Sequence, residues 1–521
     1  MIISFISLSL ITLFFYISIS GYGKLLIILF NFKNDLFRNI KIVEFFFGLI
    51  LIGFFAVLYN FFYHLGDYFS YSIILIGLII YSIFLINNLL EIRELFTIVP
   101  VLLIAIFFSF YSISNDDFDY HFKTIIIFKE NPIVVDLLHL IDDGNRISFN
   151  SHWLIINSVY YLNKYPASVF CITSLLYSLA VCDFFRFYKN SSNTFNKLAV
   201  LYSFFIMIFL LGVINYQKEY GTDYPGQIII LIIFLIFFYK SDNLLNKNDH
   251  KIFYVMLLLA YFAVSIKLFN VLIFILLLFI FLRLNNKIKI IFFSSLLSLP
   301  LFFWILQNYL ISGCLLWPIS ITCFNNAAEA KNLFYEIEFF TKSLNHKANP
   351  NIDPLSKEQS LELIKNFNWV AIWFKSHFSK ILEIYGIYFA LLITPYFFLK
   401  KNKIRKKLSE IKKNESFFNS SLNNPYIIFS LFSLIATMIW FIKSPAYRFA
   451  IGYNLNFLII FLFPMWLKIL KNNINIYYIS VRTIFIISIL FFLYQNINKI
   501  ESYKERHGLY WPNIIEGKYL N

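Results

Sequence analysis

The sequence predicts an all-α integral membrane protein with about fourteen transmembrane helices of about 20 residues each. Hydrophobic residues make up 59% of the 521 residues and charged residues only 14%, whereas soluble globular proteins contain about 25% charged residues. The mean hydropathy is +0.70. The long runs are apolar on all sides, which excludes an outer-membrane barrel, because barrel strands alternate polar and apolar residues.

Apolar runs divide the chain into successive spans. Residues 1–20 lack a basic leader and a small-residue cleavage site, so they are predicted to be a first span rather than a removable signal peptide. Lys267 divides the long stretch 252–283 into two short spans or a broken hairpin. The remaining runs lie at residues 42–62, 69–87, 96–114, 153–185, 198–215, 226–239, 289–309, 380–399, 425–442, 452–468 and 477–495.

The distribution of Lys and Arg predicts which loops face the cytoplasm. Between Lys400 and Lys413, basic residues outnumber the single acid Glu410, and basic loops are retained in the cytoplasm. The net charge of +15 therefore indicates basic loops rather than nucleic-acid binding. Counting spans from this loop places five further basic segments inside, namely 24–41, 186–197, 240–251, 283–289 and 468–471. The outward segments are 115–152, 216–226, 311–379, 443–453 and the tail after 495.

An acidic cluster opens the first large outward segment. Asp116, Asp117 and Asp119 directly follow the run 96–114. Carboxylates this close at a bilayer surface repel one another, which raises at least one pKa or recruits a divalent cation. Either effect suits a general base or a metal-assisted site, with Asp117 and Asp119 as possible metal ligands. The alternative is a solvated acidic end of a loop.

The same outward segment contains further polar side chains that suit chemistry on a lipid phosphate. Residues 133–141 have apolar positions at helical spacing, which predicts a short amphipathic helix in the membrane interface. A carboxylate would transfer a proton, and cations would bind the phosphate. Each histidine is alternatively a structural hydrogen-bonding residue. The candidate substrate-binding residues here are Tyr120, His121, His139, Arg146, Asn150 and His152.

Two further cations are candidate phosphate ligands. Arg448 lies in the outward segment 443–453, and arginine binds phosphate through two parallel hydrogen bonds. The alternative for Arg448 is an interfacial anchor whose charge reaches water. Lys267 interrupts an apolar stretch, where a charge is costly and indicates a function, unless it is the turn residue of a hairpin.

Cysteine spacing and one helix signal complete the outward segments. Cys314 and Cys323 would form a disulfide if that side is an oxidising compartment, whereas Cys171 and Cys182 are expected to be free. Ser356 and Gln359 form a capping-box start. The apolar residues that follow, to residue 374, predict an interfacial helix that roofs a site or anchors the loop. No zinc-ligand spacing and no Gly-rich nucleotide loop occurs in the sequence.

Four short elements together resemble a family of bacterial polytopic membrane proteins that look like glycosyltransferases of the GT-C type. The order and sidedness of these elements carry the resemblance, which covers residues 96–455. The elements are Asp116, Tyr120 and His121; then His139, Arg146, Phe149, Asn150, Ser151 and Trp153; then Ser312, Gly313, Cys314 and Pro318; and finally Trp440, Pro445, Arg448, Phe449 and Ala450.

This resemblance implies a function. Enzymes of the GT-C type use polyprenyl-phosphate-linked sugar donors, and an Asp in the first outward loop deprotonates the acceptor hydroxyl. By motif position that base is Asp116. Three extra spans precede the loop here, which departs from the simpler family pattern. The expected arrangement is one membrane domain with extra spans in 1–95, a GT-C-like core in 96–455 and C-terminal spans and tail in 456–521.

The expected partners are a polyprenyl-phosphate-linked sugar donor, a glycan or lipid-linked acceptor and the lipid bilayer, with no nucleic acid. The expected location is the bacterial inner membrane, with the acidic loop facing the periplasm. Two alternatives remain open. One is a polysaccharide polymerase of the O-antigen type, which relies mainly on outward arginines, and the other is a flippase or transporter of lipid-linked glycans.

Overall fold

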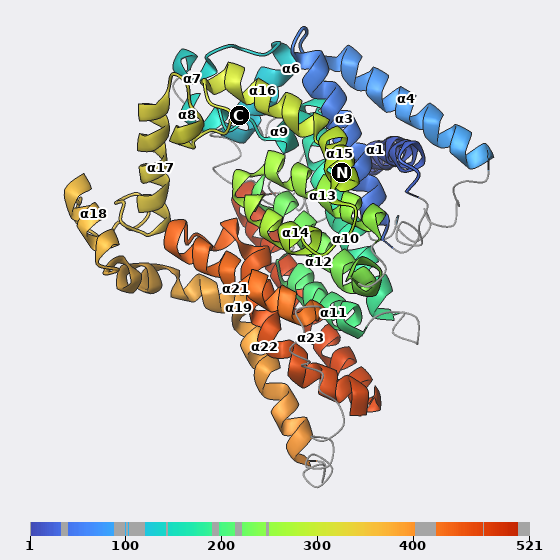
Figure 1. Ribbon diagram of the computed structural model, residues 1–521, viewed down its shortest axis with the longest axis vertical. Helices are drawn as coiled ribbons and strands as arrows, with labels where there is room; N and C mark the ends of the chain where they lie inside the picture. The colour runs from blue at the N-terminus through green and yellow to red at the C-terminus, as the bar shows by residue number, and fades with distance from the viewer. Residues whose placement is uncertain are drawn as a thin grey trace.

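The computed structural model shows a bundle of helices (Figure 1). The described part of the chain contains no strand, only two isolated bridges between single residues. The predicted all-α class is therefore confirmed. The structure describes residues 2–32, 40–87, 99, 103, 120–141, 144–189, 197–213, 221–245, 249–401, 424–472 and 474–508.

The helices follow one another along the chain with short connections. In the first half they are α1 (Ile2–Leu29), α3 (Lys41–Asn60), α4 (Asp67–Ile86), α6 (Phe122–Glu130), α7 (Leu137–Leu140), α8 (Gly144–Ile147), α9 (His152–Tyr160), η2 (Pro166–Phe170), α10 (Cys171–Lys189), α11 (Lys197–Val213) and α12 (Asp223–Leu245). In the second half they are α13 (His250–Ile266), η4 (Leu268–Leu272), α14 (Ile273–Phe281), α15 (Lys287–Leu297), α16 (Leu299–Ser312), η5 (Ser320–Thr322), α17 (Ala327–Thr341), α18 (Lys357–Lys365), α19 (Trp369–Lys401), α21 (Pro425–Lys443), η6 (Tyr447–Phe449), α22 (Ile451–Asn472) and α23 (Ile474–His507).

Eight of these helices are long and apolar enough to cross a membrane. The pair α15 and α16, bent by 51° near Pro300, makes a ninth if it is one span. Proline at the second position of α16 is compatible with a helix start but not with a straight continuation of α15. Four shorter apolar helices accompany them in the described residues. The predicted run 96–114 lies almost entirely outside the described residues.

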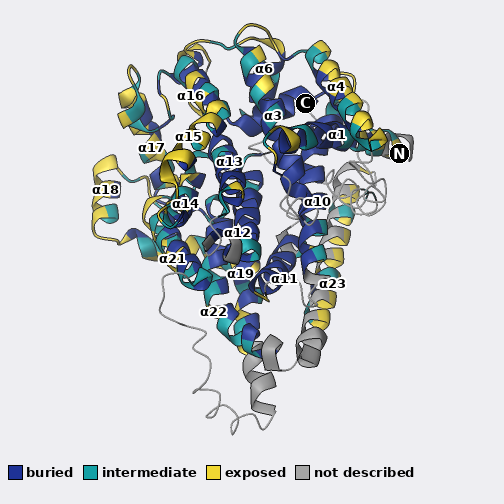
Figure 2. Cartoon of the chain, turned by 45° about the vertical axis from the view of Figure 1, so that its right-hand side comes forward, coloured by how far each residue is buried: buried dark blue, intermediate teal, exposed yellow. Residues whose placement is uncertain are grey.

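The centre of the bundle is dry and apolar. Residues 228–238 of α12 are each at most 2% exposed, and α13 packs along this helix. Figure 2 shows the same buried character in α10, α11 and α13, whereas exposed residues concentrate on peripheral helices. A helix that is apolar all round fits only where other helices or lipid surround it.

Peripheral α4 shows the opposite pattern, an exposed apolar face. Tyr71, Leu75, Ile79 and Ile83 lie on one face at four-residue spacing, and each is 46–58% exposed. An exposed apolar stripe of this length on a long helix is unsuited to water and suits contact with lipid acyl chains. The structure thus describes an all-helical protein with helices suited to membrane insertion.

Hydrogen bonds join the segments that the charge distribution assigned to one side of the membrane. Lys251 donates to the carbonyl oxygen of Asn31 at 2.8 Å, and the backbone N–H of Ile42 donates to Asp183 at 2.7 Å. All four residues lie in or beside predicted inward segments. At the other end, Asn60 donates to the carbonyl oxygen of Asn131 at 3.0 Å. We call this second end of the bundle the site end.

Three predicted elements differ from the structure. The run 153–185 is not one span, because a turn at 161–165 before Pro166 separates α9 from α10. The helix predicted over 133–141 shrinks to α7, since the N–H groups of Ile133 and Asp136 donate to α3 and α16 instead. The helix predicted over 356–374 is two helices, because Phe367 adopts a φ of 57° between α18 and α19.

Two local predictions are confirmed. Lys267 divides the stretch 252–283, because α13 ends at Ile266 and Lys267 is extended. Ser356 and Gln359 form the predicted capping box at the start of α18, with both reciprocal hydrogen bonds present. Both features depend on short-range sequence signals, which explains why the sequence was sufficient for them.

Replacing Gly21 with alanine is expected to destabilise the protein. A Cβ at Gly21 would lie 2.3 Å from the carbonyl oxygen of Gly77, so α1 and α4 would have to separate. Overpacking of this kind costs about 1–3 kcal/mol. The measurement is the unfolding temperature of the detergent-solubilised protein. Gly386→Ala is the control, since a Cβ there meets nothing within 4 Å. Equal unfolding temperatures of the two variants would contradict this packing.

Candidate functional site

The three predicted catalytic carboxylates, Asp116, Asp117 and Asp119, lie outside the described residues. Tyr120 and His121, which follow them directly, lie at the start of α6 at the site end. The geometry of the site therefore comes from the other predicted residues and from partners that the sequence pattern did not indicate.

Lys267 and Arg448 approach the same carboxylate. The Lys267 ammonium pairs with Asp223 Oδ1, and Arg448 Nε lies 3.4 Å from Asp223 Oδ2. The three residues come from the end of α13, from η6 and from the start of α12. We call Asp223, Lys267 and Arg448 the charge triad. Two residues that were predicted separately as phosphate ligands are thus brought together by the fold.

An aromatic ring and the solvent border the charge triad. The Lys267 ammonium lies 3.7 Å from the centroid of the Phe449 ring, and the Arg448 guanidinium lies 5.7 Å from it. Cations are attracted to the face of an aromatic ring at such distances. The side chains of Lys267, Asp223 and Arg448 are 20%, 18% and 34% exposed. The cations are therefore held in place yet remain accessible to a ligand.

A buried amide fixes the backbone around the charge triad. Gln227, one turn after Asp223, donates to Asn270 Oδ1 at 3.0 Å and to the carbonyl oxygen of Phe449 at 2.9 Å. Its own carbonyl oxygen accepts from the N–H of Gly452 at 2.9 Å. Gln227 thereby ties α12 to η4, η6 and α22. These neutral amides lie inside apolar sequence, where no spacing signal marks them.

Two tryptophans position the segment before Arg448. Trp440 Nε1 donates to the carbonyl oxygen of Ala446 at 2.8 Å, and Trp373 Nε1 donates to that of Pro445 at 2.8 Å. A buried indole N–H needs such an acceptor. The Trp440 and Pro445 positions of the fourth sequence element therefore have a structural role, which is to hold the turn that presents Arg448.

A second network at the site end consists of neutral amides. Asn150 donates to Asn308 Oδ1 at 2.8 Å, and Gln307 donates to Asn60 Oδ1 at 3.1 Å. Trp304 Nε1 donates to the carbonyl oxygen of Asn150 at 2.7 Å. Asn150 has a φ of 46°, which asparagine tolerates better than most residues. Asn150 therefore joins α9 to α16 and α3, and it is buried rather than open to a ligand.

The two networks adjoin each other through the start of α9. Ser151 donates to the carbonyl oxygen of Ile266 at 2.7 Å, directly before Lys267. His152 Nδ1 lies 3.0 Å from Ser265 Oγ, and its ring packs against Gly53 of α3. His152 is 2% exposed. The structure thus places His152 as an internal contact beneath the site rather than on its surface.

Tyr120, His121 and Arg146 form a third group, beside an apolar groove. The rings of Tyr120 and His121 lie 4.1 Å apart, and the Arg146 guanidinium lies 5.8 Å from the Tyr120 ring centroid. The groove has a volume of about 590 Å³. It is lined by Phe122, Lys123, Ile126, Ile127, Leu140, Ile141 and Ile147. This lining is branched and apolar, with one cation.

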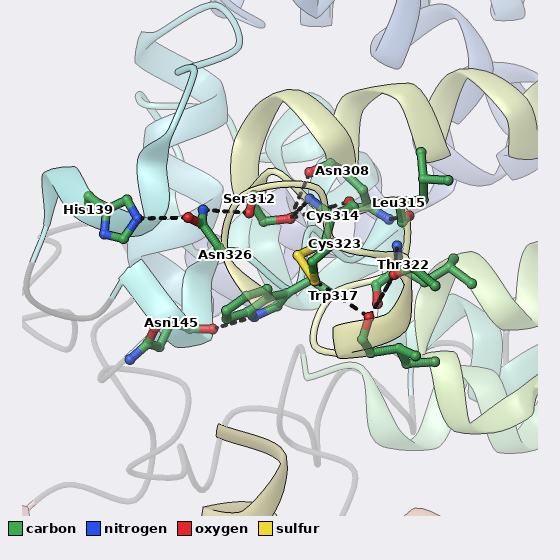
Figure 3. Close-up of a disulfide and its surroundings, with 12 residues drawn as sticks. His139, Asn145, Asn308, Ser312, Cys314, Leu315, Trp317, Thr322, Cys323 and Asn326 are labelled. Atoms are coloured by element: carbon green, nitrogen blue, oxygen red, sulfur yellow. Dashed lines mark hydrogen bonds between the residues drawn. A yellow bond between two sulfur atoms is a disulfide. The ribbon is translucent and has the colours of Figure 1, made fainter. Parts of the chain in front are cut away.

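A disulfide between Cys314 and Cys323 closes the loop after α16 (Figure 3). Trp317 in this loop donates from Nε1 to the carbonyl oxygen of Asn145 at 3.0 Å. His139 Nε2 lies 3.3 Å from Asn326 Oδ1, and Asn326 donates to the carbonyl oxygen of Ser312 at 2.9 Å. The disulfide loop therefore holds the segment that contains His139 and Arg146. It sets His139 apart from the charge triad.

Removing the disulfide is expected to loosen the segment 136–149. The Cys314→Ser/Cys323→Ser variant should lose about 2–4 kcal/mol of stability, and backbone amides of 136–149 should exchange hydrogen faster. Mass-spectrometric hydrogen exchange measures this directly. Reduced wild-type protein should match the variant, whereas the reductant should not change the variant itself. Unchanged exchange in 136–149 would show that the Trp317 contact is sufficient without the disulfide.

An ion pair away from the charge triad provides a comparison. Lys129 of α6 lies 2.9 Å from Asp67 Oδ1 and donates to Ser70 Oγ at 2.7 Å. Burial lowers the pKa of Lys129, and Asp67 opposes this shift. Asp67 begins α4 as Asp223 begins α12. The described residues contain no group of three or more His, Cys, Asp or Glu side chains placed to hold a metal ion.

The fold and site together define an all-helical protein with membrane-spanning helices whose polar and charged side chains meet at one end of the bundle. The chain belongs to the family described as a domain of unknown function, DUF8201, which matches residues 1–455. The matched region includes the charge triad and the disulfide loop. No curated protein matches the chain, and no solved structure matches it.

Proposed function

We propose that this protein is a membrane glycosyltransferase that moves a sugar from a polyprenyl-phosphate carrier to a glycan or glycolipid acceptor. The charge triad carries the proposal. Lys267 and Arg448 are two cations from distant segments that meet at one accessible place. Two such cations suit the phosphate of a lipid-linked donor, whose negative charge grows as the sugar leaves.

The groove beside α6 supports the lipid part of this proposal. Its branched apolar lining suits an isoprenoid chain, and Lys123 suits a phosphate at one end of that chain. The acidic cluster directly precedes α6 in sequence, so Asp116 is the proposed general base, with Asp117 and Asp119 as its partners or as ligands of a divalent cation.

The proposed architecture is GT-C-like with fourteen crossings. The bent pair and the four shorter apolar helices would bring the eight long spans to thirteen, and the run 96–114 would be the fourteenth. The proposed location is the bacterial inner membrane with the site end facing the periplasm. There the enzyme would act in surface polysaccharide or lipopolysaccharide assembly.

Mass spectrometry of lipid-linked and surface glycans tests this function. A deletion strain should lack one sugar residue while the rest of the glycan is unchanged, and the wild-type gene should restore that residue. Complete repeat units that accumulate without polymerisation would instead identify a polysaccharide polymerase. Complete units retained on the cytoplasmic side would identify a flippase, and either outcome would overturn the transferase proposal.

A further inference from the structure

We infer that the Asp223 carboxylate occupies the position of an anionic ligand group, and that a phosphate ester binds by displacing Asp223 from Lys267 and Arg448. This inference rests on the phosphate site of the proposed function and adds how that site is kept ready. In the ligand-free protein, Asp223 would act as an internal counter-ion.

The charge balance of the triad favours such an exchange. Two cations share one carboxylate, so the charge triad has a net positive charge, and both cations are partly exposed. Without a counter-ion, the two cations would repel each other at the edge of an apolar bundle. A phosphate ester provides more oxygen atoms and, as a monoester, about 1.5–2 negative charges. It can therefore satisfy both cations, whereas Asp223 shares its two oxygens between them.

The surroundings of the charge triad do not depend on Asp223. Gln227 holds η4 and η6 through its hydrogen bonds to Asn270 and Phe449. The Phe449 ring attracts both cations from below. Lys267 is also fixed through its backbone, whose N–H donates to the carbonyl oxygen of Ala263 at 3.1 Å. The two cations therefore stay near one place when the carboxylate turns away.

Phosphate binding by the full-length protein in maltoside micelles tests the inference, because this detergent contains no phosphate. Asp223→Asn should bind inorganic phosphate and farnesyl phosphate at least about tenfold more tightly than wild type, since the competing charge is gone. Isothermal titration calorimetry gives the dissociation constants. The matched control is Asp67→Asn, which also removes an ion-paired carboxylate from the first position of a helix. It should bind both probes as wild type does.

The two probes distinguish the source of the phosphate. Tighter binding of both would identify the phosphate group itself as the ligand, and tighter binding of farnesyl phosphate alone would identify a lipid headgroup. Farnesol should show no gain. Adding Lys267→Gln to Asp223→Asn should remove the gain, and Asp223→Ser should reproduce it if the Asn variant folds poorly.

The inference is overturned if folded Asp223→Asn and Asp223→Ser proteins bind both probes no more tightly than wild type. The charge triad would then be a structural ion cluster. This failure is separable from failure of the proposed function. Tighter phosphate binding without any sugar transfer would leave the inference standing and remove the transferase, and sugar transfer with unchanged phosphate binding would do the reverse.

Discussion

Asp116→Asn is expected to reduce the rate of sugar transfer by about 100-fold to 10,000-fold, because an amide cannot accept the proton of the acceptor hydroxyl. The measurement is kcat of purified protein with a polyprenyl-phosphate sugar donor and excess acceptor. The KM for the donor should change little, since Asp116 is proposed to act on the acceptor. A carboxylate restored as Glu should recover part of the rate.

The neighbouring carboxylates provide the controls for Asp116. Asp117→Asn and Asp119→Asn should lower the rate less than Asp116→Asn does, because neither is proposed to take the proton. If these two bind a divalent cation, their loss should be partly offset by added magnesium, whereas the loss in Asp116→Asn should not. Full activity of Asp116→Asn, with Asp117→Asn inactive, would move the base by one residue.

The sequence was sufficient for features that depend on neighbouring residues. The run 425–442 became α21, the break at Lys267 was predicted from a charge within apolar sequence, and the capping box at Ser356 was recognised from its spacing. Each of these signals is complete within a few residues. Hydrophobic length and local hydrogen bonding decide such elements without knowledge of the fold.

The sequence was insufficient where distant segments decide the outcome. Asp223 follows an ordinary polar loop, and its pairing with Lys267 and Arg448 joins three segments far apart in the chain. Gln227 and Asn270 are neutral, so charge counting passed over them. The segment 133–136 has a helical pattern, yet its N–H groups donate to α3 and α16. Tertiary hydrogen bonds outweighed local propensity there.

Arg448→Gln and Lys267→Gln are each expected to lower kcat/KM for the polyprenyl-phosphate donor by about 10-fold to 150-fold, the value of one hydrogen bond to a charged group. Lys129→Gln is the matched control, because it removes a buried cation paired with Asp67 at the same end of the bundle. That variant should lower the unfolding temperature and leave kcat/KM for the donor unchanged.

Combining the substitutions separates binding from folding. Lys267→Gln/Arg448→Gln leaves the Asp223 carboxylate without either cation, so this double variant should be less stable than each single variant. Adding Asp223→Asn should restore the unfolding temperature, because the unpaired charge is gone, but it should not restore kcat/KM. If the triple variant recovers activity together with stability, the two cations only hold the fold. If it recovers stability alone, they bind the donor phosphate.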